Sequence, residues 1–329
     1  MPDGLSMRLF PILLAPLGLC LLLASFPGCA EMPDPWKDHP QKLKILASFP
    51  PLYSLVKSVG GDRVAVQCLC TTAGPHDYTF NANDSVLIRK ADFFFSNGLT
   101  LDNLFVDRMN KDAKNPALKL VRLGARLPKS MRIETKDDAH HGPGHEHHNH
   151  GSFDPHVWLG IPQVIHMIGS IQDELSLADP EEAGQYQSRA QALIQRIREL
   201  ETEGKASLEK KVNKKIVTFH ESLSYFAKSF GLEIAAVIQT QPGDEPNSPA
   251  LAAIIRVCLE KKPALIAVEP QYQKTTSAKL LQEELRKKGL NIPLVVIDPL
   301  ETCQAANLSA DWFEKSFKAN LVNLVKHLP

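Results

Sequence analysis

The sequence predicts an α/β protein made of two lobes, each with a mostly parallel sheet flanked by helices, joined by one long rigid helix. Two observations carry this prediction. Short apolar runs of strand length alternate with stretches of helical periodicity, which is typical of parallel sheets. The same alternation occurs twice, on either side of a long amphipathic stretch at residues 179–211. We therefore expect an N-terminal lobe at residues 42–178 and a C-terminal lobe at residues 212–329.

Each lobe contains four strand-like runs, most of them separated by a helical pattern. In the N-terminal lobe the strands are expected at Leu43–Ser48, Val64–Leu69, Ala91–Ser96 and Leu118–Leu123, and the helices at Leu52–Val59, Ala82–Arg89 and Leu101–Asp112. In the C-terminal lobe the strands are expected at Lys215–Phe219, Leu232–Ile238, Ala264–Glu269 and Pro293–Asp298, and the helices at Ser222–Phe230, Pro249–Lys261, Thr275–Lys288 and Ala310–His327.

The stretch between the lobes has the start signals of a helix. Asp179 is a typical N-cap residue, Pro180 suits the first turn, and two glutamates follow it. Apolar residues then recur every three or four positions. As a single helix, residues 179–211 would span roughly 50 Å. The alternative is a pair of helices broken at Gly204.

The first 29 residues have the features of an export signal. Arg8 precedes an uncharged apolar run, Leu9–Phe26, and small residues follow. The sequence "FPGC" resembles a bacterial lipoprotein cleavage site, although its Phe and Pro are unusual there, so Cys29 is a candidate lipid anchor. Plain cleavage nearby and a membrane-spanning helix are the alternatives. Residues 30–41 are rich in Pro and Asp, and we interpret them as a tether.

The charge balance of the sequence points to no polyanionic partner. Lys plus Arg equals Asp plus Glu, at 37 each, so the composition indicates neither a nucleic-acid partner nor an anionic membrane surface.

Residues 134–151 contain almost no apolar side chains and are rich in histidine, which predicts a disordered loop.

Four cysteines lie beyond the predicted signal: Cys68, Cys70, Cys258 and Cys303. Export would permit disulfides. The spacing assigns no pairing, and four buried thiols remain the alternative.

Potential metal ligands lie at the ends of several predicted elements. His76 is in the loop after the second strand, His220 directly follows "KIVTF", and Glu269 and Asp298 end two later strands. His156 lies in "FDPHVW", just before another helix. Ligands of open parallel sheets bind at the carboxyl ends of the strands. Imidazole and carboxylate donors suit Zn²⁺ and are acceptable to Mn²⁺ or Fe²⁺. Taken singly, a histidine at the end of a strand is more often a loop residue that forms hydrogen bonds, and Asp298 before Pro299 is consistent with a turn.

Several motifs in order, from about residue 42 to residue 328, resemble those of the solute-binding proteins of zinc and manganese ABC importers, the ZnuA-like group. They are "ASFPPLYSLVKSVGGDRVAV", "GPHDYTFNANDSVLIRKADFFFSNGLTLD", "FDPHVWLG", "HESLSYFAKSFGLE" and "VEPQYQKTTSAKLLQEEL" with "VVIDPL". The resemblance implies two lobes with a metal between them and delivery to a membrane permease rather than catalysis. The wording "NANDS" after the first metal loop and the two cysteines of "CLCTTAGPH" depart from the family pattern.

The resemblance also implies a set of metal ligands. His76, His156 and His220 match the family's ligand positions, and Asp298 matches the acidic fourth position. Whether water, Asp298 or Glu269 completes the coordination shell stays open. Asp77 and Asp154 are placed to orient the imidazoles.

In the family that the sequence resembles, histidine at the third ligand position and a His-rich loop are typical of zinc members. The resemblance and the extra nitrogen donors therefore favour zinc over manganese or iron as the transported ion. Six loop histidines form a possible auxiliary metal site: His140, His141, His145, His147, His148 and His150. A loop without fixed geometry would bind metal weakly, so we expect His156 to matter more. A functionless solubilising insertion is the alternative for this loop.

The predicted function is therefore that of an exported, periplasmic or lipid-anchored, monomeric component of an ABC importer. Its partners would be a membrane permease and the cytoplasmic ATPase of that permease. The alternatives are a manganese or iron carrier of the same family, a zinc-dependent hydrolase, and a metal-binding surface adhesin. Against a hydrolase, the sequence has no "HExxH" motif.

Overall fold

The computed structural model describes residues 34–135, 153–239, 245–270 and 276–329. Residues 34–329 form one compact unit. The predicted signal (1–29), the first four residues (30–33) of the predicted tether (30–41) and the histidines at 140–150 lie outside the described residues. Among the described residues, no helix has the length and apolar character needed to cross a membrane.

The first lobe is built on a four-stranded parallel sheet with the strand order β2-β1-β3-β4. The strands are β1 (Leu43–Ala47), β2 (Val64–Cys68), β3 (Phe93–Ser96) and β4 (Lys119–Arg122), and the helices are α1 (Pro50–Gly60), α2 (Ala82–Lys90), α3 (Asn103–Ala113) and α4 (Ile161–Ala178). The inner strand β3 is buried along its whole length, because helices cover both faces of such a sheet.

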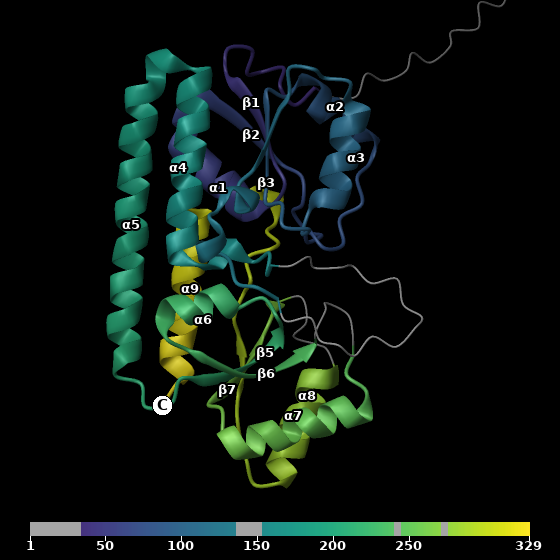
Figure 1. The fold of residues 1–329 in the computed structure, drawn as a ribbon, viewed down its shortest axis with the longest axis vertical. Coiled ribbons are helices and arrows are strands. Elements are labelled where there is room, and N and C mark those ends of the chain that lie inside the picture. Colours follow the sequence, from purple (N-terminus) through teal and green to yellow (C-terminus); the bar gives the residue numbers. More distant parts are fainter. Residues whose placement is uncertain (1–33, 136–152, 240–244, 271–275) are drawn as a thin grey trace, which may run out of the picture. The chain divides into compact units, whose positions relative to one another are not determined.

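The second lobe repeats this plan with the strand order β6-β5-β7-β8, also parallel (Figure 1). The strands are β5 (Lys215–His220), β6 (Glu233–Gln239), β7 (Leu265–Val268) and β8 (Leu294–Val296), and the helices are α6 (Ser224–Phe230), α7 (Ser248–Lys261), α8 (Thr276–Lys287) and α9 (Trp312–His327). The predicted fold class is thus confirmed.

The long helix α5 (Ala183–Glu209) links the lobes without a break. It packs against α1 and α4 of the first lobe and against α6 and α9 of the second (Figure 1). The alternative of a break at Gly204 is wrong. A Cβ at this glycine would lie 2.7 Å from Phe230 and 3.0 Å from Leu321, so the glycine lets two helices approach closely rather than ending one.

The start of α5 also differs from the expectation. Asp179 does not cap the helix; its carboxylate instead accepts hydrogen bonds from Arg63, at 2.9 Å, and from the hydroxyl of Tyr186. A 3₁₀ turn, Pro180–Glu182, precedes the α-helix. Asp179 therefore marks the start of the linking helix, as expected, but its carboxylate ties α5 to the first lobe instead of capping the helix.

One large apolar core runs through both lobes, from β1 and β3 through α4 and α5 to Phe226 and Phe317. A smaller core lies in the second lobe and includes Val217 and Leu281. The lobes therefore share buried surface instead of meeting only at a linker.

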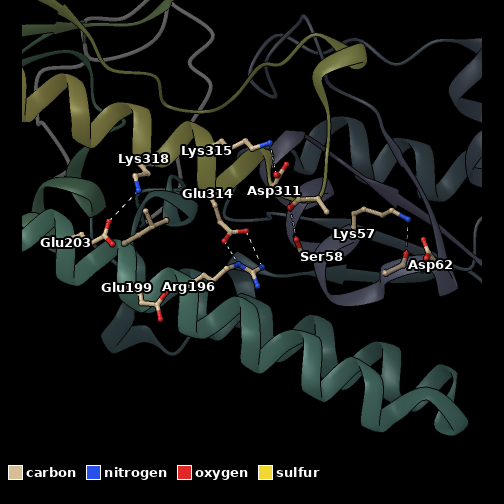
Figure 2. A pocket seen from close by; sticks show the side chains of 13 residues that line it. Lys57, Ser58, Asp62, Arg196, Glu199, Glu203, Asp311, Glu314, Lys315 and Lys318 are labelled. Carbon is tan, nitrogen blue, oxygen red and sulfur yellow. Dashed lines mark hydrogen bonds and ion pairs between the residues drawn. The ribbon is translucent and has the colours of Figure 1, made fainter.

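A surface cavity of about 690 Å³ lies where α1, α5 and α9 meet (Figure 2). Ion pairs between α5 and α9 cross it: Arg196 contacts Glu314 at 2.6 Å and Lys318 contacts Glu203 at 3.6 Å. The hydroxyl of Ser58 donates to the carbonyl oxygen of Ala310. The ion pairs fasten α9 to the linking helix, and the Ser58 bond fastens the segment before α9 to α1 of the first lobe.

Candidate metal centre

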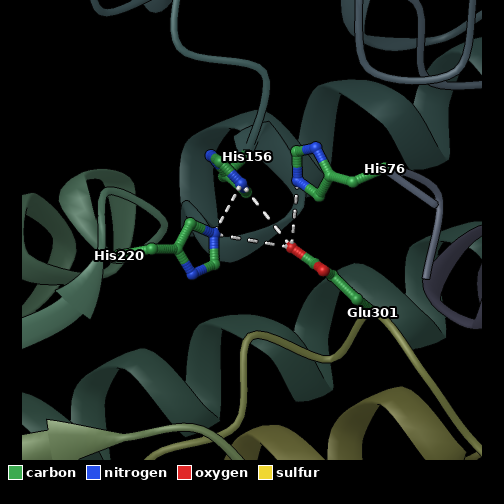
Figure 3. Close-up of side chains that lie close together, drawn as sticks. All are labelled: His76, His156, His220 and Glu301. Atoms are coloured by element: carbon green, nitrogen blue, oxygen red, sulfur yellow. Dashed lines mark hydrogen bonds and ion pairs between the residues drawn. The ribbon is translucent and has the colours of Figure 1, made fainter. Parts of the chain in front are cut away.

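Four side chains from distant parts of the chain converge on one point (Figure 3). They are His76, His156, His220 and Glu301, and one potential ligand atom from each lies within 4.8 Å of the others. The last three are buried, and the side chain of His76 is 13% exposed. This is a closed site with a single partly exposed member.

Each residue is placed by the end of an element. His76 lies in the turn that follows β2, and His156 directly precedes the 3₁₀ helix η4 (Val157–Leu159) that leads into α4. His220 is the last residue of β5, and Glu301 lies in the segment after β8. The site thus occupies the carboxyl ends of strands, where parallel sheets place their ligands.

The distances between the converging atoms suit a tetrahedral metal ion. Oε1 of Glu301 lies 3.5 Å from Nε2 of His76, 3.6 Å from Nε2 of His156 and 3.9 Å from Nε2 of His220. The Nε2 atoms of His156 and His220 are 3.4 Å apart. Ligands about 2.0–2.1 Å from a tetrahedral Zn²⁺ lie roughly 3.3–3.4 Å from one another. Oε1 of Glu301 is also buried, with no hydrogen-bond partner within the part of the chain that the structure describes. The donor set therefore fits a zinc ion.

Two carboxylates orient the imidazoles from behind. Oδ1 of Asp154 lies 2.7 Å from Nδ1 of His156 and also accepts the backbone N–H of the same residue. Glu269 contacts Nδ1 of His220. A carboxylate at Nδ1 keeps a proton on that nitrogen, so Nε2 is the nitrogen whose lone pair faces the centre once the imidazole is neutral. Glu269, considered from the sequence as a ligand, lies behind His220 instead.

The acidic member of the cluster differs from the one that the sequence indicated. Asp298 does not belong to the converging group, and Glu301, three residues further on, does. Oδ1 of Asp298 instead accepts the N–H of Leu300 at 2.7 Å. Between the two acids, Leu300 has a φ of 64°, which turns the chain so that Glu301 faces the centre. The stretch "IDPLET" contained both candidates, and only the turn decides between them.

Electrostatics favour a cation at this point. Although burial works to lower it, the carboxylates of Asp154 and Glu301 raise the pKa of His156 to about 10. Burial works to raise the pKa of Glu301, but the charges of the neighbouring imidazoles, His76 first, hold it well below its usual range. Outside the cluster, burial raises the pKa of Asp298 to about 6.

A second loop supports His156 and was not recognised from the sequence. The side-chain amide of Asn97 donates to the carbonyl oxygen of Pro155 at 2.9 Å. The buried Asp102 accepts the backbone N–H groups of Asn97 and Gly98. Residues 98–100 all have positive φ values, between 55° and 75°. The motif "ADFFFSNGLTLD" therefore builds a tight turn that supports the His156 segment. This motif is the feature of the sequence from which the supporting loop could have been recognised.

The family described as "Zinc-uptake complex component A periplasmic" matches residues 45–327. Among curated proteins, the chain is 27% identical over 319 residues to the zinc-binding lipoprotein AdcA of Streptococcus pneumoniae, covering 95% of this chain and 60% of AdcA. The chain thus spans about 60% of the length of this relative.

Two solved structures share the fold. A Zn(II)-bound mutant variant of AdcAII from Streptococcus pneumoniae is 26% identical, with a TM-score of 0.72, and the match covers 88% of this chain and 99% of AdcAII. The solute-binding protein FpvC of Pseudomonas aeruginosa, in complex with Mn²⁺, is 25% identical, with a TM-score of 0.73, and the match covers 87% and 98% of the two chains. The family is one of solute-binding proteins and not of enzymes. Because the family match covers most of the two-lobed unit, this chain belongs to the family of zinc-uptake complex component A.

Proposed function

We propose that this protein is the extracytoplasmic solute-binding component of a metal ABC importer. It captures Zn²⁺ at His76, His156, His220 and Glu301 and delivers the ion to a membrane permease that is driven by a cytoplasmic ATPase. The single observation that carries the proposal is the buried convergence of three imidazole nitrogens and one carboxylate oxygen within 4.8 Å.

Zinc is the ion that this donor set suits best. Three neutral imidazoles and one carboxylate are borderline donors at tetrahedral spacing, whereas manganese prefers more oxygen ligands. The relative AdcA is a zinc-binding lipoprotein, and the similar AdcAII structure is Zn(II)-bound. Four protein ligands also leave no open position for a reacting water, which argues against a hydrolase.

Capture and release require no covalent chemistry. The first lobe supplies His76 and His156, and the second supplies His220 and Glu301. A small relative movement of the lobes would therefore remove ligands from the ion when the protein docks on its permease. The N-terminal export signal, with Cys29 as a candidate lipid anchor, would hold a monomer outside the cytoplasmic membrane.

Zinc titration by calorimetry near neutral pH tests the site. Four forms of residues 34–329 are compared: the unaltered chain, a deletion of residues 140–150, His156→Ala, and His327→Ala. His327 lies outside the cluster, bonds the carbonyl of Asn323 in its own helix and serves as the matched control. We expect one tight site in all forms except His156→Ala. If the deletion loses tight binding and His156→Ala keeps it, the site lies in the His-rich loop and the proposal is overturned.

A further inference from the structure

The segment that carries Glu301 is held by backbone hydrogen bonds both before and after that residue. Asn320 of α9 accepts the N–H of Asp298 at 2.8 Å and donates to its carbonyl at 2.7 Å. The indole N–H of Trp158 donates to the carbonyl of Pro299 at 2.7 Å. Beyond Glu301, the N–H of Cys303 donates to the carbonyl of Thr71 at 2.8 Å. The last two bonds reach into the first lobe.

Within this segment, Leu300 adopts a conformation that leucine disfavours. Its φ is 64°, in the left-handed region, and its side chain is fully buried. A buried residue stays in such a conformation only when its surroundings determine it. The carboxylate of Asp298 supplies the local restraint, because its Oδ1 accepts the N–H of Leu300 at 2.7 Å. This is the short side-chain turn that aspartate forms with the backbone two residues on.

We propose that Asp298 and Trp158 are positioning residues for Glu301, holding its carboxylate at the metal centre before the ion arrives. This inference rests on the proposed metal site and deepens it. Asp298 fixes the turn at Leu300, and Trp158 fixes the turn to the segment that presents His156, two residues earlier in the chain. The 3₁₀ helix η4 therefore follows the ligand His156 directly and, through Trp158, also anchors the segment that carries the ligand Glu301.

The physical consequence is preorganisation. A carboxylate on a loose segment must be ordered when the ion binds, and that entropy reduces affinity. Trp158 is itself fixed, because it is fully buried and its ring packs edge-on against Phe49 at 4.6 Å between centroids. Supporting residues of metal sites contribute about 10- to 100-fold in affinity, which sets the size of the expected effect.

The test compares Asp298→Asn with Asp298→Ala in the full chain, using Zn²⁺ in competition with a chelator of known affinity. Asparagine keeps the acceptor for the N–H of Leu300 and loses the charge, whereas alanine loses both. We expect Asp298→Asn to bind zinc within about threefold of the unaltered chain and Asp298→Ala to bind about 10- to 100-fold more weakly. Equal weakening of both variants would show that Asp298 acts through its charge. No weakening in Asp298→Ala would also overturn the proposal.

Trp158→Phe gives an independent measurement. It removes the indole N–H while keeping an aromatic ring against Phe49, and Trp312→Phe, at the partly exposed start of α9, is the matched control. We expect weaker zinc binding in the first variant only.

The visible absorption of the Co²⁺-loaded protein is read in parallel, because its intensity reports tetrahedral coordination and a general loss of stability would not change it. We expect it to fall in Asp298→Ala and in Trp158→Phe; intensities equal to that of the unaltered chain would overturn the proposal.

Zinc binding by the unaltered chain and by Glu301→Gln distinguishes a failure of the metal site from a failure of the positioning role. If it binds no zinc, or if Glu301→Gln leaves its affinity unchanged, the proposed metal site itself fails. If Glu301→Gln weakens binding and Asp298→Ala does not, the site stands and only the positioning role is refuted.

Discussion

Zinc binding at pH 8 should release about one proton from each protein molecule. Metal binds neutral imidazole, so a protonated ligand must lose its proton first. The pKa of His156 is raised to about 10, because the carboxylates of Asp154 and Glu301 outweigh the opposing effect of burial. In the metal-free protein at pH 8, His156 is then about 99% protonated, whereas a histidine of ordinary pKa 6.5 would be about 3% protonated.

This difference sets the pH dependence of affinity. A raised histidine pKa means that the protonated form competes with zinc at every pH below about 10. The apparent association constant should therefore rise about tenfold for each pH unit between 7 and 9, or about 1.4 kcal/mol per unit. With an ordinary histidine, this rise would level off above about pH 7.

Calorimetry at pH 8 in two buffers of different ionisation enthalpy measures the protons released. The slope of the observed enthalpy against the buffer enthalpy gives their number directly. Asp154→Asn removes the nearer carboxylate charge and should reduce the release, because the pKa of His156 falls. Release near zero in the unaltered chain at pH 8 would refute the charged state assigned to His156.

Three further predictions concern single contacts. Glu301→Gln should weaken zinc binding about 10²- to 10⁴-fold, since removing one partner of a buried charge pair costs about 3–5 kcal/mol. Chelator competition measures the loss, and the control Glu284→Gln, at a partly exposed residue of α8, should bind zinc normally. Gly204→Ala should lower the free energy of unfolding by about 1–3 kcal/mol through overpacking against Phe230. Its control is Gly169→Ala in α4, where a Cβ meets nothing within 4 Å, and thermal denaturation should show no loss there. The hydroxyl of Tyr225 accepts the N–H of Ile133 at 2.8 Å, and Tyr225→Phe removes this acceptor. The free energy of unfolding, measured in urea, should fall by about 1–3 kcal/mol, and an unchanged midpoint would contradict this.

The order of strands and helices was readable from the sequence because it depends on neighbours a few positions apart. Alternation of apolar runs with helical periodicity predicted eight strands, and the structure has eight among its described residues. Position at the end of a strand or before a helix made His76, His156 and His220 candidates, since the carboxyl ends of parallel strands meet at one edge. The family resemblance was needed to single them out as ligands. The predicted lobe boundaries stay a prediction.

Which carboxylate joins those histidines was decided by contacts between residues distant in the sequence. Asp298 and Glu301 are three residues apart, and both are acidic residues at the end of the same strand. The left-handed turn at Leu300 separates them, and it is held by Trp158 and Asn320 as well as by Asp298 itself. In the same way, only the pairing of β5 with β7 places Glu269 behind His220. Periodicity and strand ends locate a ligand segment, but the direction of a side chain depends on tertiary hydrogen bonds from elsewhere in the chain.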